Sequence, residues 1–379
     1  MNNFSDIGVG RKVIFGLLAT VLFFCLVEVG FRVVVSLTSD RLTSMIGQYR
    51  TQFYSHINQE LAYRPHPYFG YVRRDKGDND AINRLGFWGS EWAVDKPVDT
   101  IRVVALGGST TAGPLAWPYQ LEVELNGRLV DKKVQVHNLG MGGWTSAEAV
   151  AAFSTVGLSL DPDMVVVHCV NNDMEPMRAI APEVDYSHYR RAMDVVQTDA
   201  GAATYKQDFG DVVDAVAAQW SNLYVYAKLF DSGAVPTRAS LHGLTTWATD
   251  TTAEPSAEGI AIFERNLRSV AALAEANGAT MVLTTMPALA VARPGIPTVP
   301  DGHLKSLASQ NERLRQLAAR EGWLLVDLAK LSDELTTTFE DAIHVDIRGE
   351  QIKARAIADA LVQAGIGSQP VNTEITPSK

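Results

Sequence analysis

The chain has 379 residues, of which 46% are hydrophobic and 20% charged, a composition typical of a globular protein with one large domain or two ordinary ones and not of a disordered one. Its formal net charge of −10 argues against a nucleic-acid partner, because nucleic-acid binders usually carry a basic face. The two cysteines, Cys25 and Cys169, lie in apolar runs and predict no disulfide framework, and no C-x-x-C or H-E-x-x-H pattern predicts a metal site.

The first predicted element is a membrane-spanning helix over Val13–Leu37, which is longer than the roughly 20 apolar residues that a bilayer requires. Arg11 and Lys12 precede it and favour a cytoplasmic N-terminus, with the rest of the chain extracytoplasmic. A cleaved signal peptide is the alternative, although no A-x-A-like cleavage site follows the apolar core. Glu28 and Arg32 are four residues apart within this helix, and we interpret them as a local ion pair near the outer interface.

Changes in composition divide the chain into four parts. Residues 1–38 are expected to be the cytoplasmic N-terminus and the anchor. Residues 39–98 are polar, aromatic and irregular and predict a stalk and a segment that docks on the main domain. The main domain is expected over 99–367, with an insertion at about 175–254 that interrupts its alternation of strands and helices. Residues 368–379 are expected to be a disordered tail.

From Ile101 onward, predicted strands alternate with predicted helices. The strands are expected at Ile101–Leu106, Val134–Asn138, Met164–Val170, Thr280–Thr285 and Leu324–Val326. The helices are expected at Trp117–Leu129, Ser146–Ser159, Glu258–Asn277, His303–Glu321 and Arg348–Ala364. This alternation predicts a parallel sheet with helices on both faces. In such sheets, ligand sites form at the carboxyl ends of the strands.

Four polar motifs follow predicted strands. They are GGSTT at 107–111, NLGMGGWTS at 138–146, NND at 171–173 and DAIHVDIRG at 341–349. In this order and at these positions they resemble the SGNH (GDSL-type) hydrolase superfamily over about residues 99–365. The segments INRLGFWGSE and VEVGFR resemble membrane-anchored bacterial members of it. The resemblance implies a three-layer α/β/α sandwich with a parallel, flavodoxin-like sheet, preceded here by the transmembrane helix.

The resemblance also implies roles for five residues. Ser109 matches the nucleophile of the superfamily, and Asp341 and His344 match the acid and base of its D-x-x-H motif. The oxyanion hole is expected from the backbone N–H groups of Ser109 and Gly143 and from the side-chain amide of Asn172. No cofactor or metal ion is implied.

Two positions depart from the superfamily pattern. Gly108 stands where the G-D-S motif has an aspartate, and Val170 stands where the G-x-N-D motif has a glycine. The first departure marks either a subfamily or a loop that passes unusually close to another group. The second alters the local loop and leaves the amide of Asn172 in place.

Elementary chemistry supports the same assignment. A serine hydroxyl is a weak nucleophile unless a base lies within hydrogen-bond reach. His344 can take that proton, because imidazole side chains as a class exchange protons readily near neutral pH. Asp341 lies three residues earlier, so one turn brings its carboxylate to the imidazole N–H and stabilises the imidazolium. Acyl transfer also builds up an oxyanion, which requires preorganised donors, and a glycine at 143 lets the backbone approach closely.

Each of these residues also has a structural interpretation, which the sequence leaves open. Ser109 suits a helix cap or a turn, and Gly143 suits a turn. Asn172 suits an Asx-turn, Asp341 a loop cap and His344 an exposed surface. A phosphate-binding loop fits less well, because the Walker pattern requires a lysine where this chain has a proline, and the glycines do not match G-x-G-x-x-G.

The remaining chemically capable residues are expected to be structural. They are Asp173, Asp346, His66, His137, His168 and Cys169. The aromatic residues of the insertion are expected in a core or an interface, with an acyl or sugar groove as the alternative; they are Tyr205, Trp220, Tyr224, Tyr226 and Trp247.

These observations predict a membrane-anchored extracytoplasmic serine esterase that hydrolyses O-acyl esters, chiefly acetyl esters, on envelope or exported polysaccharide. An O-acyltransferase with the same triad and a glycan acceptor is one alternative. A non-catalytic glycan-binding scaffold on the same fold is another. The sequence does not determine the acyl length, the alcohol, the role of the insertion or the oligomeric state.

Overall fold

The computed structural model describes residues 9–38, 46, 63–74, 82–93, 95–189, 195–197, 203–205, 216–217, 220–231, 254–289 and 301–366. The chain divides into two compact units. One comprises Met1–Leu61 and Met193–Leu244, and the other comprises Ala62–Ala192 and Thr245–Lys379. Each unit is described by itself.

The second unit is built on a five-stranded sheet in the order β4-β3-β5-β8-β9, in which every paired strand is parallel to its neighbour. The strands are β3 (Thr100–Gly107), β4 (Lys133–Asn138), β5 (Met164–His168), β8 (Thr280–Thr284) and β9 (Leu324–Val326). The central strand β3 is buried along its whole length, as expected for a strand covered on both faces. The predicted α/β fold with a parallel sheet is therefore confirmed.

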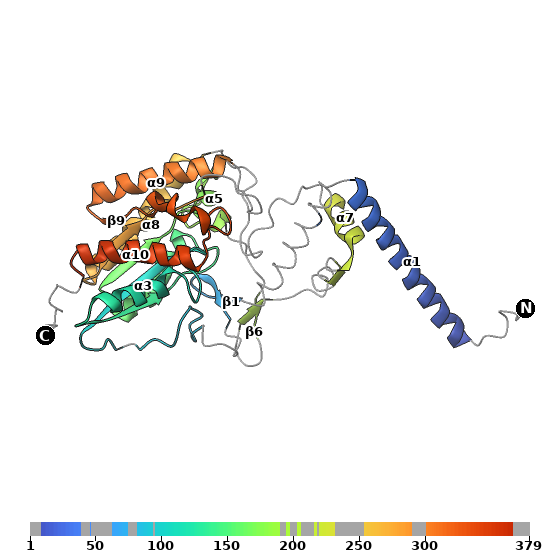
Figure 1. Ribbon diagram of the computed structural model, residues 1–379, viewed down its shortest axis with the longest axis horizontal. Helices are drawn as coiled ribbons and strands as arrows, with labels where there is room; N and C mark the ends of the chain where they lie inside the picture. Colours follow the sequence, from blue (N-terminus) through green and yellow to red (C-terminus); the bar gives the residue numbers. More distant parts are fainter. Residues whose placement is uncertain are drawn as a thin grey trace, which may run out of the picture. The chain divides into compact units, whose positions relative to one another are not determined.

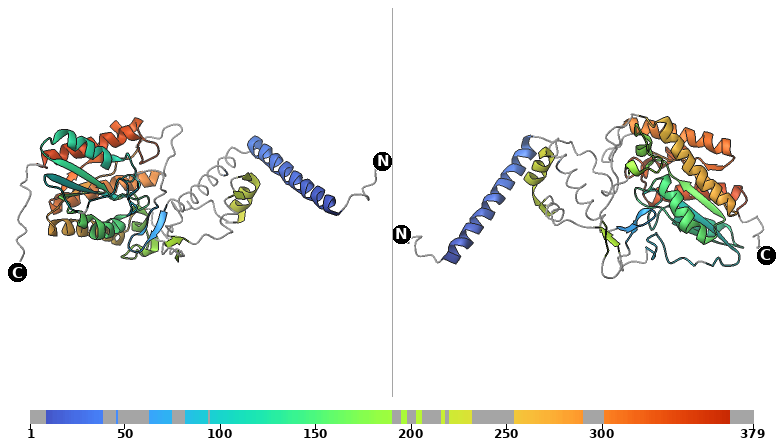
Figure 2. Two further views of the ribbon diagram at one scale, coloured as in Figure 1. Left: turned by 90° about the horizontal axis from the view of Figure 1, so that it is seen from below. Right: turned by 180° about the vertical axis from the view of Figure 1, so that it is seen from behind.

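Helices cover both faces of this sheet (Figures 1 and 2). The helices are α3 (Trp117–Arg128), α4 (Ser146–Ala152), α5 (Met174–Met177), α8 (Ala257–Ala276), α9 (Asp301–Glu321) and α10 (Ile347–Gln363). Short 3₁₀ turns lie at Leu158–Leu160, Ser187–Tyr189, Leu328–Leu331 and Glu334–Thr337. Helices α3 and α10 pack together on one face. Helices α8 and α9 lie side by side on the other, where Arg268 pairs with Glu321.

The core beneath α3 and α10 follows directly from the sequence pattern. Alternate residues of β3 point into it, and Trp117 and Leu121 of α3 and Ile357 and Leu361 of α10 meet them, all at most 5% exposed. Alternation on the strand and the spacing of three to four residues on each helix place these side chains on one face.

Two predicted elements end two or more residues earlier than expected. The helix expected over Ser146–Ser159 is α-helical to Ala152 and continues as a π-turn at Phe153–Gly157, where the ring of Phe153 occupies the space that a side chain at Gly157 would take. The third strand ends at His168 rather than at Val170. Val170 has a φ of 157°, which a β-branched residue rarely adopts, so the chain leaves the sheet two residues early.

An antiparallel hairpin precedes the sheet in this unit. It consists of β1 (Tyr63–His66) and β2 (Gly70–Arg73). Residues 82–93 follow, and Trp88 forms a bridge to Asn138 at the end of β4. This part of the predicted docking segment therefore contacts the end of β4.

The first unit contains α1 (Val9–Thr38), β6 (Val195–Gln197), β7 (Ala203–Tyr205) and α7 (Asn222–Asp231). Within α1, Gly10–Leu37 is long and apolar enough to cross a membrane, a property that signal sequences share. The expected ion pair between Glu28 and Arg32 forms, with 2.7 Å between the two side chains.

Glu28 also holds the start of α7, which the sequence did not predict. Its carboxylate accepts hydrogen bonds from the backbone N–H of Asn222 at 2.6 Å and of Leu223 at 3.1 Å. Carboxylates stabilise helix N-termini in this way. Tyr224 and Tyr226 of α7 pack, together with Phe31 of α1, against a small buried apolar cluster.

The aromatic residues of the insertion therefore lie in different environments. Tyr224 and Tyr226 are partly buried at the α1–α7 contact, as expected for interface residues. Trp220 is 70% exposed. Trp247, the side chain of Tyr205 and the expected tail at 368–379 lie outside the described residues.

Candidate active site

Ser109 lies on the turn that begins where β3 ends at Gly107. The backbone N–H groups of Thr111 and Ala112 both donate to the carbonyl of Gly108 at 3.1 Å. This tight turn places the Ser109 side chain at the carboxyl edge of the sheet, where sites of doubly wound folds form.

Three side chains that are distant in sequence form one hydrogen-bonded chain at this edge. His344 Nε2 lies 2.7 Å from Ser109 Oγ, and His344 Nδ1 lies 2.6 Å from Asp341 Oδ2. These distances suit proton transfer between nucleophile and base, with the base oriented by a third group.

The backbone of the D-x-x-H segment holds Asp341 in place. Its Oδ1 accepts hydrogen bonds from the N–H of Ile343 at 2.8 Å and of His344 at 2.7 Å. Burial raises the pKa of the Asp341 carboxyl, but the hydrogen bonds from the His344 side chain and from the two backbone groups outweigh burial and hold its pKa below the usual value. The carboxylate is therefore ionised at neutral pH, ready to stabilise an imidazolium at His344.

The loop after β4 lies directly beside the serine turn. The N–H of Met141 donates to the carbonyl of Gly107 at 3.1 Å, and the N–H of Trp144 donates to the carbonyl of Met141 at 3.1 Å. The second bond closes a turn whose third residue, Gly143, has a φ of +76°. Glycine adopts this conformation without steric cost, so the motif glycine fits its position.

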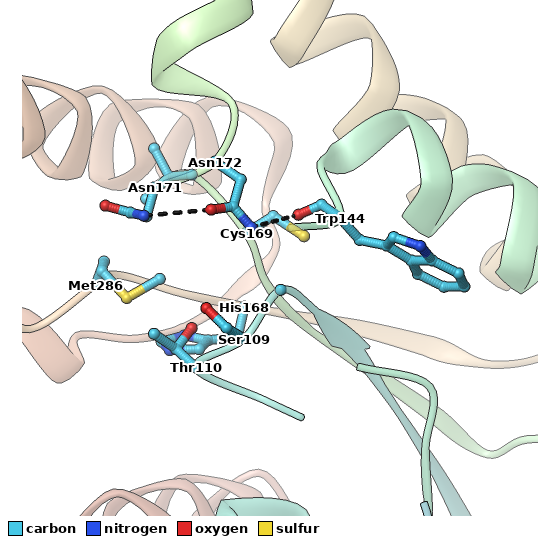
Figure 3. A pocket seen from close by; sticks show the side chains of 10 residues that line it. Ser109, Thr110, Trp144, His168, Cys169, Asn171, Asn172 and Met286 are labelled. Carbon is cyan, nitrogen blue, oxygen red and sulfur yellow. Dashed lines mark hydrogen bonds between the residues drawn. The ribbon is translucent and has the colours of Figure 1, made fainter. Parts of the chain in front are cut away.

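Asn172 lies across a small pocket from Ser109 (Figure 3). Its side-chain Nδ2 donates to the carbonyl of Trp144 at 2.8 Å, and its Oδ1 accepts from Nδ2 of Asn171 at 3.4 Å. His303 Nε2 in turn lies 3.0 Å from Oδ1 of Asn171. This chain of polar groups orients the Asn172 amide with its N–H group toward Trp144.

The position of Asn172 explains the glycine at 108. A Cβ atom at Gly108 would collide with Nδ2 of Asn172 and lie 3.2 Å from the carbonyl of Trp144. The loop therefore does pass unusually close to another group, and that group is the amide of Asn172.

Two cavities of very different size share Ser109. The smaller, about 10 Å³, has room for about one water molecule and is lined by Gly108, Ser109, Thr110, Trp144, His168, Cys169, Val170, Asn171, Asn172 and Met286. The larger, about 400 Å³, is lined by Ser109, Ala112, Gly113, Pro114, Leu115, Ala116, Glu340, Asp341, His344, Val345, Asp346, Ile347 and Glu350. Its volume falls in the usual range for small-molecule sites.

The structure thus brings the predicted catalytic residues into contact, and it adds contacts that the sequence did not indicate. His303 lies at the start of α9, and its contact with Asn171 spans 132 residues. Lys353, which is 1% exposed, donates from Nζ to the carbonyl of Thr110 at 3.2 Å. No local pattern marks either residue, because each acts through a partner far along the chain.

The residues expected to be structural have structural environments. The carboxylate of Asp173 accepts hydrogen bonds from the backbone and hydroxyl of Ser146, and Asp346 caps α10 through the N–H groups of Arg348 and Gly349. His168 and Cys169 are at most 4% exposed.

Burial governs the ionisation of these core groups. It lowers the pKa of the His168 imidazole and raises the pKa of the Cys169 thiol. It also lowers the pKa values of partly buried His66 and of buried His137 to about 4. The described residues contain no cluster of three or more side chains suited to hold a metal ion.

A parallel α/β fold with a serine, histidine and aspartate linked at the carboxyl edge of its sheet is the architecture of a serine hydrolase. The model of the GDSL-like Lipase/Acylhydrolase family matches residues 105–352, so the chain belongs to that family. The predicted resemblance is confirmed, and the protein is an enzyme that acts on ester bonds.

Solved structures with similar folds were also found. They include the acetylxylan esterase Axe2 from Geobacillus stearothermophilus, at 14% identity and a TM-score of 0.41 over 69% of this chain and 94% of that one. LAE5, an alpha/beta hydrolase from the metagenome of Lake Arreo, matches at 16% identity and a TM-score of 0.40, with coverage of 69% and 94%. A putative lipolytic protein of the G-D-S-L family from Desulfitobacterium hafniense matches at 14% identity and a TM-score of 0.39, with coverage of 69% and 99%. No protein with a curated function matched significantly.

Proposed function

We propose that this protein is a membrane-anchored, extracytoplasmic serine esterase that removes small O-acyl groups, chiefly acetyl, from envelope or exported polysaccharide. The observation that carries the proposal is the hydrogen-bonded chain from Ser109 Oγ through His344 to Asp341, with 2.7 Å and 2.6 Å between successive partners. A serine placed in this way is activated for attack on a carbonyl carbon.

The reaction follows from this arrangement. Ser109 Oγ attacks the ester carbonyl while His344 Nε2 takes its proton, and the ion pair with Asp341 stabilises the imidazolium. The N–H groups of Ser109 and Gly143 and the amide of Asn172 receive the oxyanion. His344 then returns the proton to the leaving alcohol, and water, activated in the same way, releases the acyl group from Ser109.

The two cavities support a small acyl group and a larger alcohol. The leaving oxygen must reach His344, which lines the cavity of about 400 Å³, whereas Asn172 lines the cavity of about 10 Å³. The alcohol therefore occupies the larger cavity, and an acyl chain that points past Asn172 has room for little more than a methyl group. Carboxylates, including exposed Glu340, line the larger cavity and favour an uncharged sugar over an anionic one.

The apolar helix α1 supports the proposed location. It is long enough to span a bilayer, and Arg11 and Lys12 at its start favour a cytoplasmic N-terminus. Alkaline washing of membranes from cells that make the full chain tests the anchor, because an integral protein stays in the pellet and a cleaved one is released.

A fluorophosphonate probe tests the nucleophile in the detergent-solubilised full chain. Wild-type protein should be labelled and should release acetate from acetyl esters and from acetylated neutral polysaccharide, whereas Ser109→Ala should be unlabelled and lose at least about a thousandfold in kcat. Ser154→Ala is the matched control, because Ser154 is exposed and bonds to the local carbonyl of Ala151.

The outcomes separate the possible failures. Labelling that persists in Ser109→Ala would exclude Ser109 as the nucleophile. Faster turnover of long-chain than of acetyl esters would contradict the assignment of the acyl group to the small cavity. Acetyl groups that move to an added glycan rather than to water would identify a transferase with the same triad.

A further inference from the structure

Tyr71 of β2 reaches into the loop that follows β4. Its Oη donates a hydrogen bond to the carbonyl oxygen of Gly142 at 2.7 Å, and Tyr71 is 2% exposed. Tyr71 lies before residue 105, where the match to the family model begins. The contact therefore comes from the segment that precedes the residues matched by the family model. It reaches the carbonyl of Gly142, which is the residue directly before Gly143 of the proposed oxyanion hole.

Gly142 and Gly143 share the peptide group that Tyr71 contacts. The peptide is planar and trans, so the C=O of Gly142 and the N–H of Gly143 point in opposite directions. A hydrogen bond that fixes the carbonyl toward Tyr71 therefore fixes the N–H away from Tyr71. The N–H fixed in this way is the one proposed to receive the oxyanion.

This peptide is the central one of a turn, and its orientation is not determined by the turn alone. The bond from Trp144 N–H to Met141 C=O closes the turn, and φ is positive at Gly143 and not at Gly142, which defines a type II turn. Type I and type II turns differ by a half rotation of the central peptide. Because both central residues are glycines, side-chain sterics give little preference between the two orientations.

The aromatic rings packed around Trp144 hold the side chain of Tyr71 beside this turn. The rings of Phe69, Tyr71 and Phe87 lie 5.4, 6.4 and 5.9 Å from that of Trp144. Trp144 is 1% exposed, and its carbonyl accepts the hydrogen bond from the Asn172 amide. The same packing therefore helps to position both the backbone donor and the side-chain donor of the proposed oxyanion hole.

We infer that Tyr71 is a positioning residue of the oxyanion hole: its hydroxyl holds the Gly142–Gly143 peptide in the orientation that directs the Gly143 N–H at the developing oxyanion. The bond also polarises the peptide, which makes that N–H a better donor. A carbonyl buried without this partner is destabilised, so loss of the hydroxyl favours the flipped peptide. The inference rests on the proposed function, since it assigns a role within the same reaction.

Tyr71→Phe in the full chain tests this role, because the ring stays and the hydroxyl is lost. We expect kcat on an acetyl ester to fall about tenfold, less than the 10²–10³-fold typical of deleting a donor outright, with KM within about twofold. The rate of fluorophosphonate labelling should fall by the same factor, because that reaction also places an anionic oxygen in the hole. The acidic limb of the pH profile should not move, since His344 and Asp341 are untouched.

Tyr63→Phe is the matched control. Tyr63 lies in the same hairpin, 5.3 Å from the ring of Tyr71, and is 5% exposed, and Arg73 stacks on its ring. It should retain wild-type kcat, and both variants should melt within a few degrees of wild type. If Tyr71→Phe is too unstable to assay, amide hydrogen exchange over 141–144 replaces kcat as the readout. Exchange there should accelerate more than in Tyr63→Phe.

Full activity and labelling of a folded Tyr71→Phe would overturn the inference, as would equal losses in Tyr71→Phe and Tyr63→Phe, which would indicate a packing effect alone. The failure of the proposed function looks different. In that case Ser109→Ala itself would keep its activity or its labelling, whatever Tyr71→Phe does.

Discussion

Gly108 occupies a position where no side chain fits without displacing a proposed catalytic group. Its missing Cβ leaves the space that Nδ2 of Asn172 fills, close to the carbonyl of Trp144. The aspartate that the superfamily motif carries here would compete for that space. The glycine at 108 and the placement of Asn172 are therefore coupled, and the substitution belongs to the geometry of the site.

Gly108→Ala should consequently impair catalysis more than stability. The added methyl group pushes away the end of the Asn172 side chain, so we expect kcat to fall about 10- to 100-fold, toward the effect of losing one oxyanion donor. Stability should fall by about 1 kcal/mol, because the closest contact is with a side-chain terminus and the backbone carbonyl of Trp144 needs to shift only slightly. Ester hydrolysis and urea unfolding measure the two effects.

Gly127→Ala is the control for Gly108→Ala, since a Cβ at Gly127 in α3 meets no atom within 4 Å. It should keep full activity and gain up to about 0.5–1 kcal/mol in stability. A fully active Gly108→Ala would show that Asn172 moves aside without consequence.

At the scale of elements, α10 supports both the serine turn and α3 through a buried ion pair. Lys353 Nζ lies 2.9 Å from Oε1 of Glu350 and donates to the carbonyl of Thr110. The other carboxylate oxygen of Glu350 accepts from the N–H of Trp117 at 2.8 Å. Because Ala116 offers no side-chain cap to α3, a residue of α10 supplies one.

Lys353→Met should destabilise the protein by about 3 kcal/mol, because it leaves the carboxylate of Glu350 without its charged partner in a largely buried position. The double variant Lys353→Met/Glu350→Gln should regain part of this loss, since no unpaired carboxylate remains. Urea unfolding measures both.

Lys330→Met is the matched control for the buried pair. Lys330 is 76% exposed in its pair with Asp327, and surface pairs contribute about 0–1 kcal/mol. Equal losses of stability in Lys353→Met and Lys330→Met would contradict a structural role for the buried pair.

At the scale of the whole molecule, buried histidines make the hydrolase unit sensitive to acid. Burial, with a smaller contribution from nearby Arg102, lowers the pKa of His137 to about 4 from an ordinary value of 6.5. The unfolded chain therefore binds more protons than the folded one between these values, so the free energy of unfolding falls as the pH drops from 6.5 toward 4. His66 and His168 act in the same direction.

His137→Phe should reduce this acid sensitivity. His137 is 6% exposed, its Nε2 has no hydrogen-bond partner among the described residues, and its ring packs on Trp92, so phenylalanine fits the site. We expect near-wild-type stability at neutral pH and about 1–3 kcal/mol less loss than wild type toward pH 4. Urea unfolding at several pH values measures the difference. Parallel curves for the two proteins would show that His137 does not titrate in this range.

Much of the fold was predictable because its signals are local. Buried strands such as Met164–His168 read as continuous apolar runs, and α8 and α10 carry the periodicity of half-buried helices. Element ends were predicted less well, as Val170 shows. Its apolar character extended the predicted strand, but the turn that carries Asn172 requires the chain to leave the sheet earlier.

The proposed site divides in the same way. Ser109, Asn172, Asp341 and His344 lie in short motifs at strand ends, so residue type and order were enough to name them. The residues that hold them were not predictable. Tyr71 bonds across 71 positions, His303 across 132 and Lys353 across 243, and no periodicity encodes a partner at such separations.

By itself, therefore, the sequence determined the α/β fold class, the apolar N-terminal helix, the family and the residues proposed to react, because apolar periodicity, turn chemistry and motif order are properties of neighbouring positions. Only the tertiary structure decided why position 108 is a glycine, that Tyr71 contacts the Gly142–Gly143 peptide, and that Glu28 of α1 caps α7 194 residues away. These contacts join segments that meet only after the chain has folded, when packing brings a hydroxyl, an amide or a carboxylate within hydrogen-bond distance of a distant backbone group.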